Sequence, residues 1–219
     1  KNIKQAKNVP DIGGTEEYVL SLFNGSQTSN ENRGKIFAAL PDIDWKKMSQ
    51  SDAYGNTCME LLSWIYTLNV TDNNEISSLL KATHNLDGAY AESMAAIYGK
   101  CFSNNPVQFL ESLSMLPDGQ KSVVSSLLVY NACYGNLISF ENSIIAIKED
   151  KNTPEGIIPA PDSVLDAINK LNAAMSANHS GQIPEKPETE LFHTDTIRRF
   201  IELNKELGYP YNEEYCETI

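Results

Sequence analysis

Apolar residues along most of the chain recur at intervals of three and four, the spacing that places side chains on one face of an α-helix. The stretch from about residue 54 to residue 69 is apolar over a wide arc, which is typical of a helix buried between neighbours. Its apolar stripe consists of Cys58, Leu61, Leu62, Ile65 and Leu68. No stretch shows sustained period-two alternation, so we expect an all-α fold with no β-sheet.

Capping and breaking signals divide the chain into helices. Thr15, Asp42 and Ser139 are predicted N-caps, and Asp72 followed by Glu75 has the spacing of a capping box. Residues 148–161 contain three prolines and a glycine and are predicted to form a loop. The predicted helices cover about residues 15–23, 30–40, 42–48, 54–69, 72–80, 89–101, 105–113, 120–134, 139–147, 162–175 and 194–207.

A sequence repeat organises the middle of the chain. The dipeptides Ile65-Tyr66, Ile97-Tyr98 and Val129-Tyr130 lie 32 residues apart, twice in succession. A short predicted helix, an Asp-Gly turn and a long predicted helix also occur twice. A period of this size on helical segments indicates stacked hairpins, none of which can bury its apolar face alone. We therefore predict a right-handed superhelical array of antiparallel helical hairpins, an α-solenoid-like fold with a period of about 32 residues.

The repeat is similar in general style to the α-solenoid repeats of the HEAT and armadillo kind. The similarity covers about residues 54–136, and the period is shorter than that of HEAT repeats. It implies an architecture and no family, so no functional residues are taken from it. The domain organisation predicted around the repeat is a flexible arm at 1–14, a helical repeat domain at 15–177, and an extended strap with a C-terminal helix at 178–219 that packs back on the domain.

The repeat also predicts a binding surface. Tyr66, Tyr98 and Tyr130 occupy equivalent positions on neighbouring helices, and Glu60 and Glu92 share the same 32-residue spacing. One interpretation is a tyrosine-lined groove with an acidic face, because tyrosine is enriched where proteins bind each other. The alternative is structural: rings packed between helices with their hydroxyls satisfied, and carboxylates on an ordinary solvated face.

The net charge of −12 sharpens this prediction. Residues 141–219 alone carry 15 acidic against 7 basic residues. Such a surface repels nucleic-acid phosphates and anionic lipids, so we expect neither nucleic-acid binding nor membrane insertion. A protein or peptide partner, basic in character, matches the charge, although acidity also serves solubility alone. The sequence identifies no partner, compartment or oligomeric state; the start at Lys1 fits a processed secreted protein or a trimmed chain.

Candidate chemistry is sparse. The chain has no metal-binding, nucleotide-binding or nucleophile motif, so we expect no metal or cofactor. Of the four cysteines, only Cys216 is placed to find a disulfide partner, and the other three are predicted to act as small core residues. These observations favour a non-enzymatic binding domain. The alternatives are a small-ligand receptor or enzyme with an internal pocket, and an assembly protein. The pocket would be lined by Trp45, Trp64, Tyr90 and His84.

Overall fold

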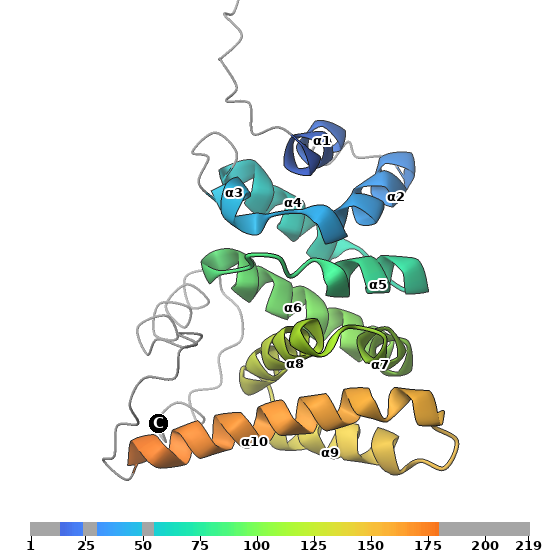
Figure 1. The fold of residues 1–219 in the computed structure, drawn as a ribbon, viewed down its shortest axis with the longest axis vertical. Coiled ribbons are helices and arrows are strands. Elements are labelled where there is room, and N and C mark those ends of the chain that lie inside the picture. Colours follow the sequence, from blue (N-terminus) through green and yellow to red (C-terminus); the bar gives the residue numbers. More distant parts are fainter. Residues whose placement is uncertain (1–13, 24–29, 50–54, 180–219) are drawn as a thin grey trace, which may run out of the picture. The chain divides into compact units, whose positions relative to one another are not determined.

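A computed structural model describes residues 14–23, 30–49 and 55–179 (Figure 1). These residues form ten α-helices and no strand, which confirms the all-α prediction for this part of the chain. The helices are α1 (Thr15–Leu22), α2 (Asn30–Ala39), α3 (Trp45–Ser49), α4 (Gly55–Thr67), α5 (Asn73–Lys81), α6 (Gly88–Asn104), α7 (Pro106–Ser114), α8 (Asp118–Cys133), α9 (Leu137–Glu149) and α10 (Pro159–His179), with short 3-10 helices η2 (Leu40–Asp42) and η3 (Glu155–Ile157).

The chain divides into two compact units, Lys1–Asn172 and Ala173–Ile219. All of the packing described below lies within the first unit. In the second unit, only the last turns of α10 belong to the described residues. The predicted N-terminal arm, the strap, the helix at 194–207 and Cys216 fall almost entirely outside the described ranges.

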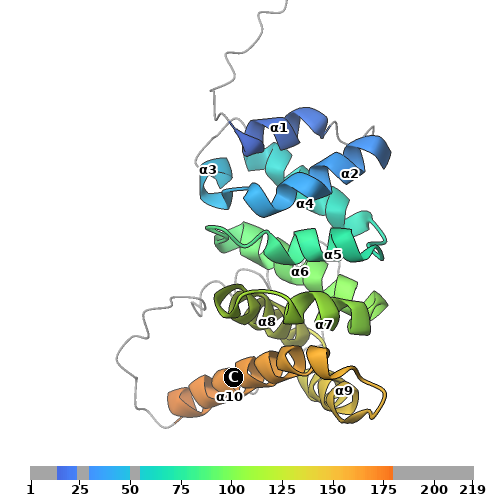
Figure 2. The same ribbon diagram turned by 45° about the vertical axis from the view of Figure 1, so that its right-hand side comes forward.

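Helices two apart in the sequence are neighbours in space. Helix α6 packs between α4 and α8, and α5 packs against α7. The short helix α7 also packs against the long helices α6 and α8 on either side of it in the sequence. Figures 1 and 2 show α4, α6 and α8 at successive levels, with α5 and α7 beside them. The arrangement follows from the apolar faces, since α6 and α8 have buried side chains over a wide arc.

Trp45 connects the start of the molecule to this stack. Its ring is fully buried, and its indole N–H donates to the carbonyl oxygen of Ala82 at 2.8 Å. Its backbone amide donates to the carbonyl of His84, and its ring lies 6.0 Å from that of Tyr90. A buried indole needs such an acceptor. These contacts hold α3 against the loop between α5 and α6.

The N-terminus of α5 is capped as the sequence predicts. The Asp72 side chain accepts hydrogen bonds from the amides of Asn74 and Glu75, as predicted for the N-cap of α5. The capping box itself is not closed by Glu75. Its carboxylate instead binds Arg33 of α2, with 2.7 Å between Nε and Oε1. The residue therefore joins two helices as well as beginning one.

The other predicted N-caps were wrong by a few residues. The helices predicted to start at Thr15, Asp42 and Ser139 are preceded instead by Gly14, Asp44 and Asn136. The Asp44 and Asn136 side chains reach the free amides of the first turn, which is the function of a cap. Helix α10 begins at Pro159 and not at Asp162. Proline is tolerated in a first turn, where its missing N–H has no partner to lose.

The cysteines of the described ranges are unpaired with one another. Cys58 and Cys101 are buried, as predicted. Cys133 is exposed, so the prediction that it acts as a core residue was wrong. It is the last residue of α8.

Candidate functional site

The three repeated tyrosines occupy equivalent backbone positions, but their side chains have different surroundings. Tyr98 is fully buried, and its hydroxyl donates to the carbonyl oxygen of Leu79 at 3.1 Å. Its ring meets that of Phe109 edge to face, with 6.3 Å between the centroids. Tyr98 is therefore a satisfied core residue, and it cannot line an open groove in this conformation.

Tyr66 lies at the end of α4 and is 43% exposed. The ammonium group of Lys100, on α6, lies 4.9 Å from the centre of the Tyr66 ring. It also donates a hydrogen bond to the Tyr66 carbonyl oxygen. A lysine at this place satisfies a terminal carbonyl, complements the negative end of the helix and makes a cation–π contact. The exposed tyrosine thus already has a cation from its own chain.

Tyr130 is paired with Tyr134, a residue that the sequence analysis did not single out. The Tyr134 hydroxyl donates to the Tyr130 hydroxyl at 2.8 Å, and the rings lie 5.2 Å apart at 79°. Tyr130 is 9% exposed and Tyr134 is 40% exposed. The spacing of four residues, which puts both rings on one helix face, was the available signal.

Glu92, on α6, interacts electrostatically with this pair. Burial raises the pKa of its carboxyl group. Burial is also the largest cause of the raised pKa of Tyr130 and Tyr134, and the negative charge of Glu92 raises the pKa of both further. Among the described residues, the Glu92 carboxylate makes no ion pair and no hydrogen bond. Glu92 is therefore coupled electrostatically to Tyr130 and to its hydrogen-bonded neighbour Tyr134; we refer to these three residues as the Glu92–Tyr130–Tyr134 cluster.

The remaining predicted site residue, Glu60, is exposed on α4. No described contact joins it to the cluster. The five predicted residues are therefore divided among four environments. Tyr98 lies in the core, Tyr66 at the α4–α6 junction, Glu92 and Tyr130 at the α6–α8 junction, and Glu60 on the exposed surface of α4.

The α6–α8 junction depends on a glycine. A Cβ atom added to Gly99 would lie 1.9 Å from Nδ2 of Asn131 and 2.5 Å from its Cγ, far closer than atoms can approach. Gly99 is buried in α6, and Asn131 lies 32 residues further on in α8. The missing side chain leaves room for the Asn131 amide against the α6 backbone, and so for the close packing of α6 on α8.

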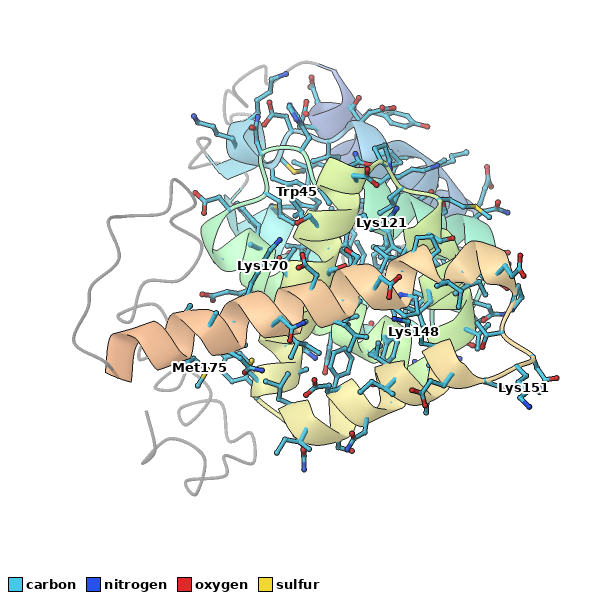
Figure 3. All side chains as sticks on the ribbon, turned by 60° about the horizontal axis from the view of Figure 1, so that its bottom comes forward. Trp45, Lys121, Lys148, Lys151, Lys170 and Met175 are labelled. Carbon is cyan, nitrogen blue, oxygen red and sulfur yellow. The ribbon has the colours of Figure 1, made fainter. Side chains whose placement is uncertain are left out.

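A second candidate site is an open cleft of about 690 Å³ between the start of α8 and the first part of α10. The hydroxyls of Ser125 and Ser163, 2.9 Å apart, join the two helices. Figure 3 shows Lys121 and Lys170 at the edge of α10 that faces α8, and Lys148 at the edge that faces α9. The charged and hydroxyl-bearing residues of the lining are Asp118, Lys121, Ser122, Glu155, Asp162, Ser163, Asp166 and Lys170.

Ion pairs within the chain balance most of the charge in this α8–α10 cleft. Lys121 pairs with Asp118 at 3.3 Å, and Lys170 pairs with Asp166 at 2.7 Å. Lys148 pairs with the remaining aspartate, Asp162, at 2.6 Å. The cleft therefore offers mixed polar groups, whereas the Glu92 carboxylate forms no ion pair with any of the described residues.

The side chains proposed for an internal pocket have other surroundings. Trp45 and Tyr90 pack together as core residues, and His84 is exposed. Trp64 packs elsewhere, with its ring 5.7 Å from that of Phe23. Burial raises the pKa of Cys58 and of Cys101 to about 12, so both thiols stay protonated at neutral pH. Only a thiolate is a good nucleophile.

The described residues hold no group of three or more His, Cys, Asp and Glu side chains arranged to bind a metal ion. No helix in the described ranges has the length and apolarity that a membrane span requires. Comparison with known proteins finds no matching protein-family model, no matching curated protein and no matching solved structure.

Proposed function

We propose that this protein is a non-enzymatic helical repeat domain that binds a basic protein segment through the Glu92–Tyr130–Tyr134 cluster. The observation that carries the proposal is the Glu92 carboxylate, which is half-buried and has no cation among the described residues. An ionised group removed from water without a partner is costly. A cationic side chain from a partner would remove that cost, so the site gains more from binding than an exposed carboxylate would.

The surroundings of Glu92 support the same partner. Tyr134 is 40% exposed and offers an aromatic ring, and aromatic faces attract cations. Tyrosine is also enriched among the residues that dominate binding energy at interfaces. The net charge of −12 would speed the approach of a basic partner over long range, with an effect that salt weakens.

The test is a comparison of two glutamates. A fluorescein-labelled peptide of alternating Gly and basic residues, with Arg and Lys in equal number, is titrated with the protein, and its anisotropy is followed. We expect Glu92→Gln to weaken binding by about tenfold, the effect of about 1.4 kcal/mol. Glu60→Gln makes the same change of charge on an exposed residue of α4 and should alter the affinity less than about twofold. Equal effects would mean that bulk acidity binds the peptide, and the cluster would be rejected.

For the fold, we propose that the hairpins form the right-handed α-solenoid-like array, with a period of about 32 residues, that the repeat predicts. The packing of α6 between α4 and α8, and of α5 on α7, supports this proposal. Duplicating residues 87–117 in tandem should then give a folded protein with more helix per chain, measured by circular dichroism and thermal unfolding. An insert of the same length and shuffled sequence is the control. If both insertions unfold the protein, the repeat is not a modular unit.

The α8–α10 cleft favours a second candidate function, the binding of a small polar ligand. Its volume of about 690 Å³ lies within the range of ligand sites. Ser163→Trp, on α10, would fill part of the cleft. A compound that raises the melting temperature of the original protein and not of this variant would support the second candidate, and a polar compound library without any such compound would remove it.

A further inference from the structure

The α8–α10 cleft lies within the first compact unit, and one of its two lysines is largely removed from water. The side chain of Lys121 is only 11% exposed, whereas that of Lys170 is 69% exposed. Figure 3 shows both lysines at the edge of α10 that faces α8. The cleft therefore holds an ammonium group in a setting where a charge is costly unless it is well paired.

Lys121 is poorly paired within the chain. Among the described residues, its ammonium group donates one hydrogen bond, to Oδ1 of Asp118 at 3.3 Å. An ammonium group has three N–H donors, and a close pair of opposite charges lies at about 2.7–2.9 Å. The Asp118 side chain is fully exposed, so water competes for it and it loses little by turning away. An anionic group of a ligand can thus replace Asp118 on Lys121.

The other charges of the lining restrict which anion can enter. Asp162 and Asp166 are each paired with a lysine, at 2.6 Å and 2.7 Å. Glu155 is exposed, lines the same cleft and has no cation among the described residues. Its carboxylate repels a second anion and attracts a cation. A ligand that carries both a carboxylate and an ammonium group satisfies Lys121 and Glu155 together, whereas a simple anion satisfies only the lysine.

The size and the remaining lining of the cleft fit an organic zwitterion. The volume of about 690 Å³ suits a small organic molecule and exceeds what a single ion needs. The lining includes the hydroxyls of Ser122 and Ser163, which can donate or accept hydrogen bonds, and the apolar side chains of Ile158 and Pro159. The described lining residues include no aromatic ring on which a nucleobase would stack. Amino acids and short peptides match this combination of end charges, amide groups and small apolar parts.

From these observations we infer that the α8–α10 cleft binds an amino acid or short peptide as a zwitterion, whose carboxylate replaces Asp118 on Lys121 and whose ammonium group pairs with Glu155. The inference rests on the second candidate function, because it names the class of ligand for the same cleft. It does not depend on the Glu92–Tyr130–Tyr134 cluster, which belongs to the α6–α8 junction.

Isothermal titration calorimetry of the full chain with alanine, Ala-Ala and Ala-Ala-Ala tests the inference. Two blocked forms of the tightest binder separate the charges, since the C-amidated form lacks the carboxylate and the N-acetylated form lacks the ammonium group. We expect the C-amidated form to bind about tenfold more weakly than the zwitterion, a difference of about 1.4 kcal/mol. The N-acetylated form should bind about threefold more weakly, because Glu155 is exposed. If either blocked form binds as tightly as the zwitterion, the inference is wrong.

Four substitutions test the assigned partners. Lys121→Met should weaken binding of the zwitterion by about tenfold, and Lys170→Met, the same change at the exposed lysine, by less than about twofold. Glu155→Gln should weaken it by about threefold and leave binding of the N-acetylated form unchanged. Asp118→Asn should tighten binding by about two- to threefold, because it removes the carboxylate that competes for Lys121. A purely structural effect of Asp118 would not tighten binding.

The outcomes separate the inference from the second candidate function. If no alanine compound binds, but the original protein binds another polar compound that Ser163→Trp does not, the inference is overturned and the second candidate stands. If no polar compound binds at all, both fail. If Lys121→Met and Asp118→Asn leave the affinity unchanged, the carboxylate binds elsewhere and the inference is wrong. Native helix content is checked by circular dichroism; should Lys121→Met lose it, Asp118→Asn decides the test, since that side chain is fully exposed.

Discussion

The α4–α6 and α6–α8 junctions contain tyrosines at equivalent positions of the repeat, but the charged groups around these tyrosines differ. At the first, Tyr66 is exposed and its ring is covered by the ammonium of Lys100. At the second, Tyr130 is nearly buried, its hydroxyl is bonded to Tyr134, and the neighbouring charge is the carboxylate of Glu92. One junction supplies its own cation, and the other presents an acid and an aromatic pair.

The difference teaches what a sequence period can and cannot specify. The residue 34 positions after Tyr66 is Lys100, which reaches back to cover the ring. The residue 34 positions after Tyr98 is Ala132, which is too short to do so, and Tyr98 is instead buried between α5 and α7. The period thus sets the register of the helices, whereas the residues that do not repeat set the environment of each tyrosine.

The largest expected effect separates Tyr98 from Tyr66. Tyr98→Ala should lower the free energy of unfolding by about 3–5 kcal/mol, because it leaves a cavity where a large buried ring was. Tyr66→Ala, at the exposed equivalent position, should cost less than about 1 kcal/mol. Urea denaturation of both variants makes the comparison. Similar losses would show that the two tyrosines have equivalent surroundings after all, contrary to the structure.

A smaller effect is expected at Gly99, where Asn131 should decide whether an added methyl group stabilises or destabilises the protein. Gly99→Ala should destabilise the protein by about 1–3 kcal/mol, because the added methyl group displaces the Asn131 amide from its packed position. In an Asn131→Ala background the same change should stabilise by up to about 1 kcal/mol, since alanine is the better helix former. Urea denaturation of the original protein, the two single variants and the double variant gives the coupling energy between positions 99 and 131. A loss of the same size in both backgrounds would mean that Asn131 is not the obstacle.

A smaller effect is expected for the cation at the first junction. Lys100→Met keeps the aliphatic length and removes the charge, and it should lower the free energy of unfolding by about 0.5–1 kcal/mol through the lost cation–π contact and carbonyl cap. A double-mutant cycle with Tyr66→Leu measures the contact itself. Lys170→Met, in an exposed pair with Asp166, is the matched control. A coupling energy of zero would remove Lys100 as the partner of Tyr66.

The smallest expected effect is the pH dependence of Glu92. Burial raises its pKa above the ordinary value of 4.5, so near this pH the folded state holds the proton more firmly than the unfolded state. Its contribution to stability is therefore present at low pH and is lost as the pH rises through the raised pKa. The difference in unfolding free energy between the original protein and Glu92→Gln, measured from pH 4 to pH 7 by urea denaturation, should fall over that window. A difference that rises with pH would place a cation beside Glu92.

Much of the local structure could be predicted from the order of residues. The all-α class follows from the spacing of apolar residues, and the Asp72 cap follows from a short side chain placed one residue before a helix. Where prediction failed, competing signals stood within a few residues, as with Asp42 and Asp44. Such cases are decided by which carboxylate reaches the free amides, and that depends on the backbone.

Only part of the candidate site could be predicted from the sequence. Glu92 and Tyr130 belong to the repeat and could be identified as candidates, and the four-residue spacing of Tyr134 was visible. The burial of Tyr98, the contact of Lys100 with Tyr66 and the electrostatic coupling of Glu92 to two tyrosines could not be predicted, because each joins residues about 19 to 42 positions apart. Periodicity, capping and net charge are properties of neighbours along the chain, so the sequence by itself determined them. Whether a carboxylate meets a lysine, a tyrosine or water was decided only when the helices packed, since burial and distance exist only in the tertiary structure.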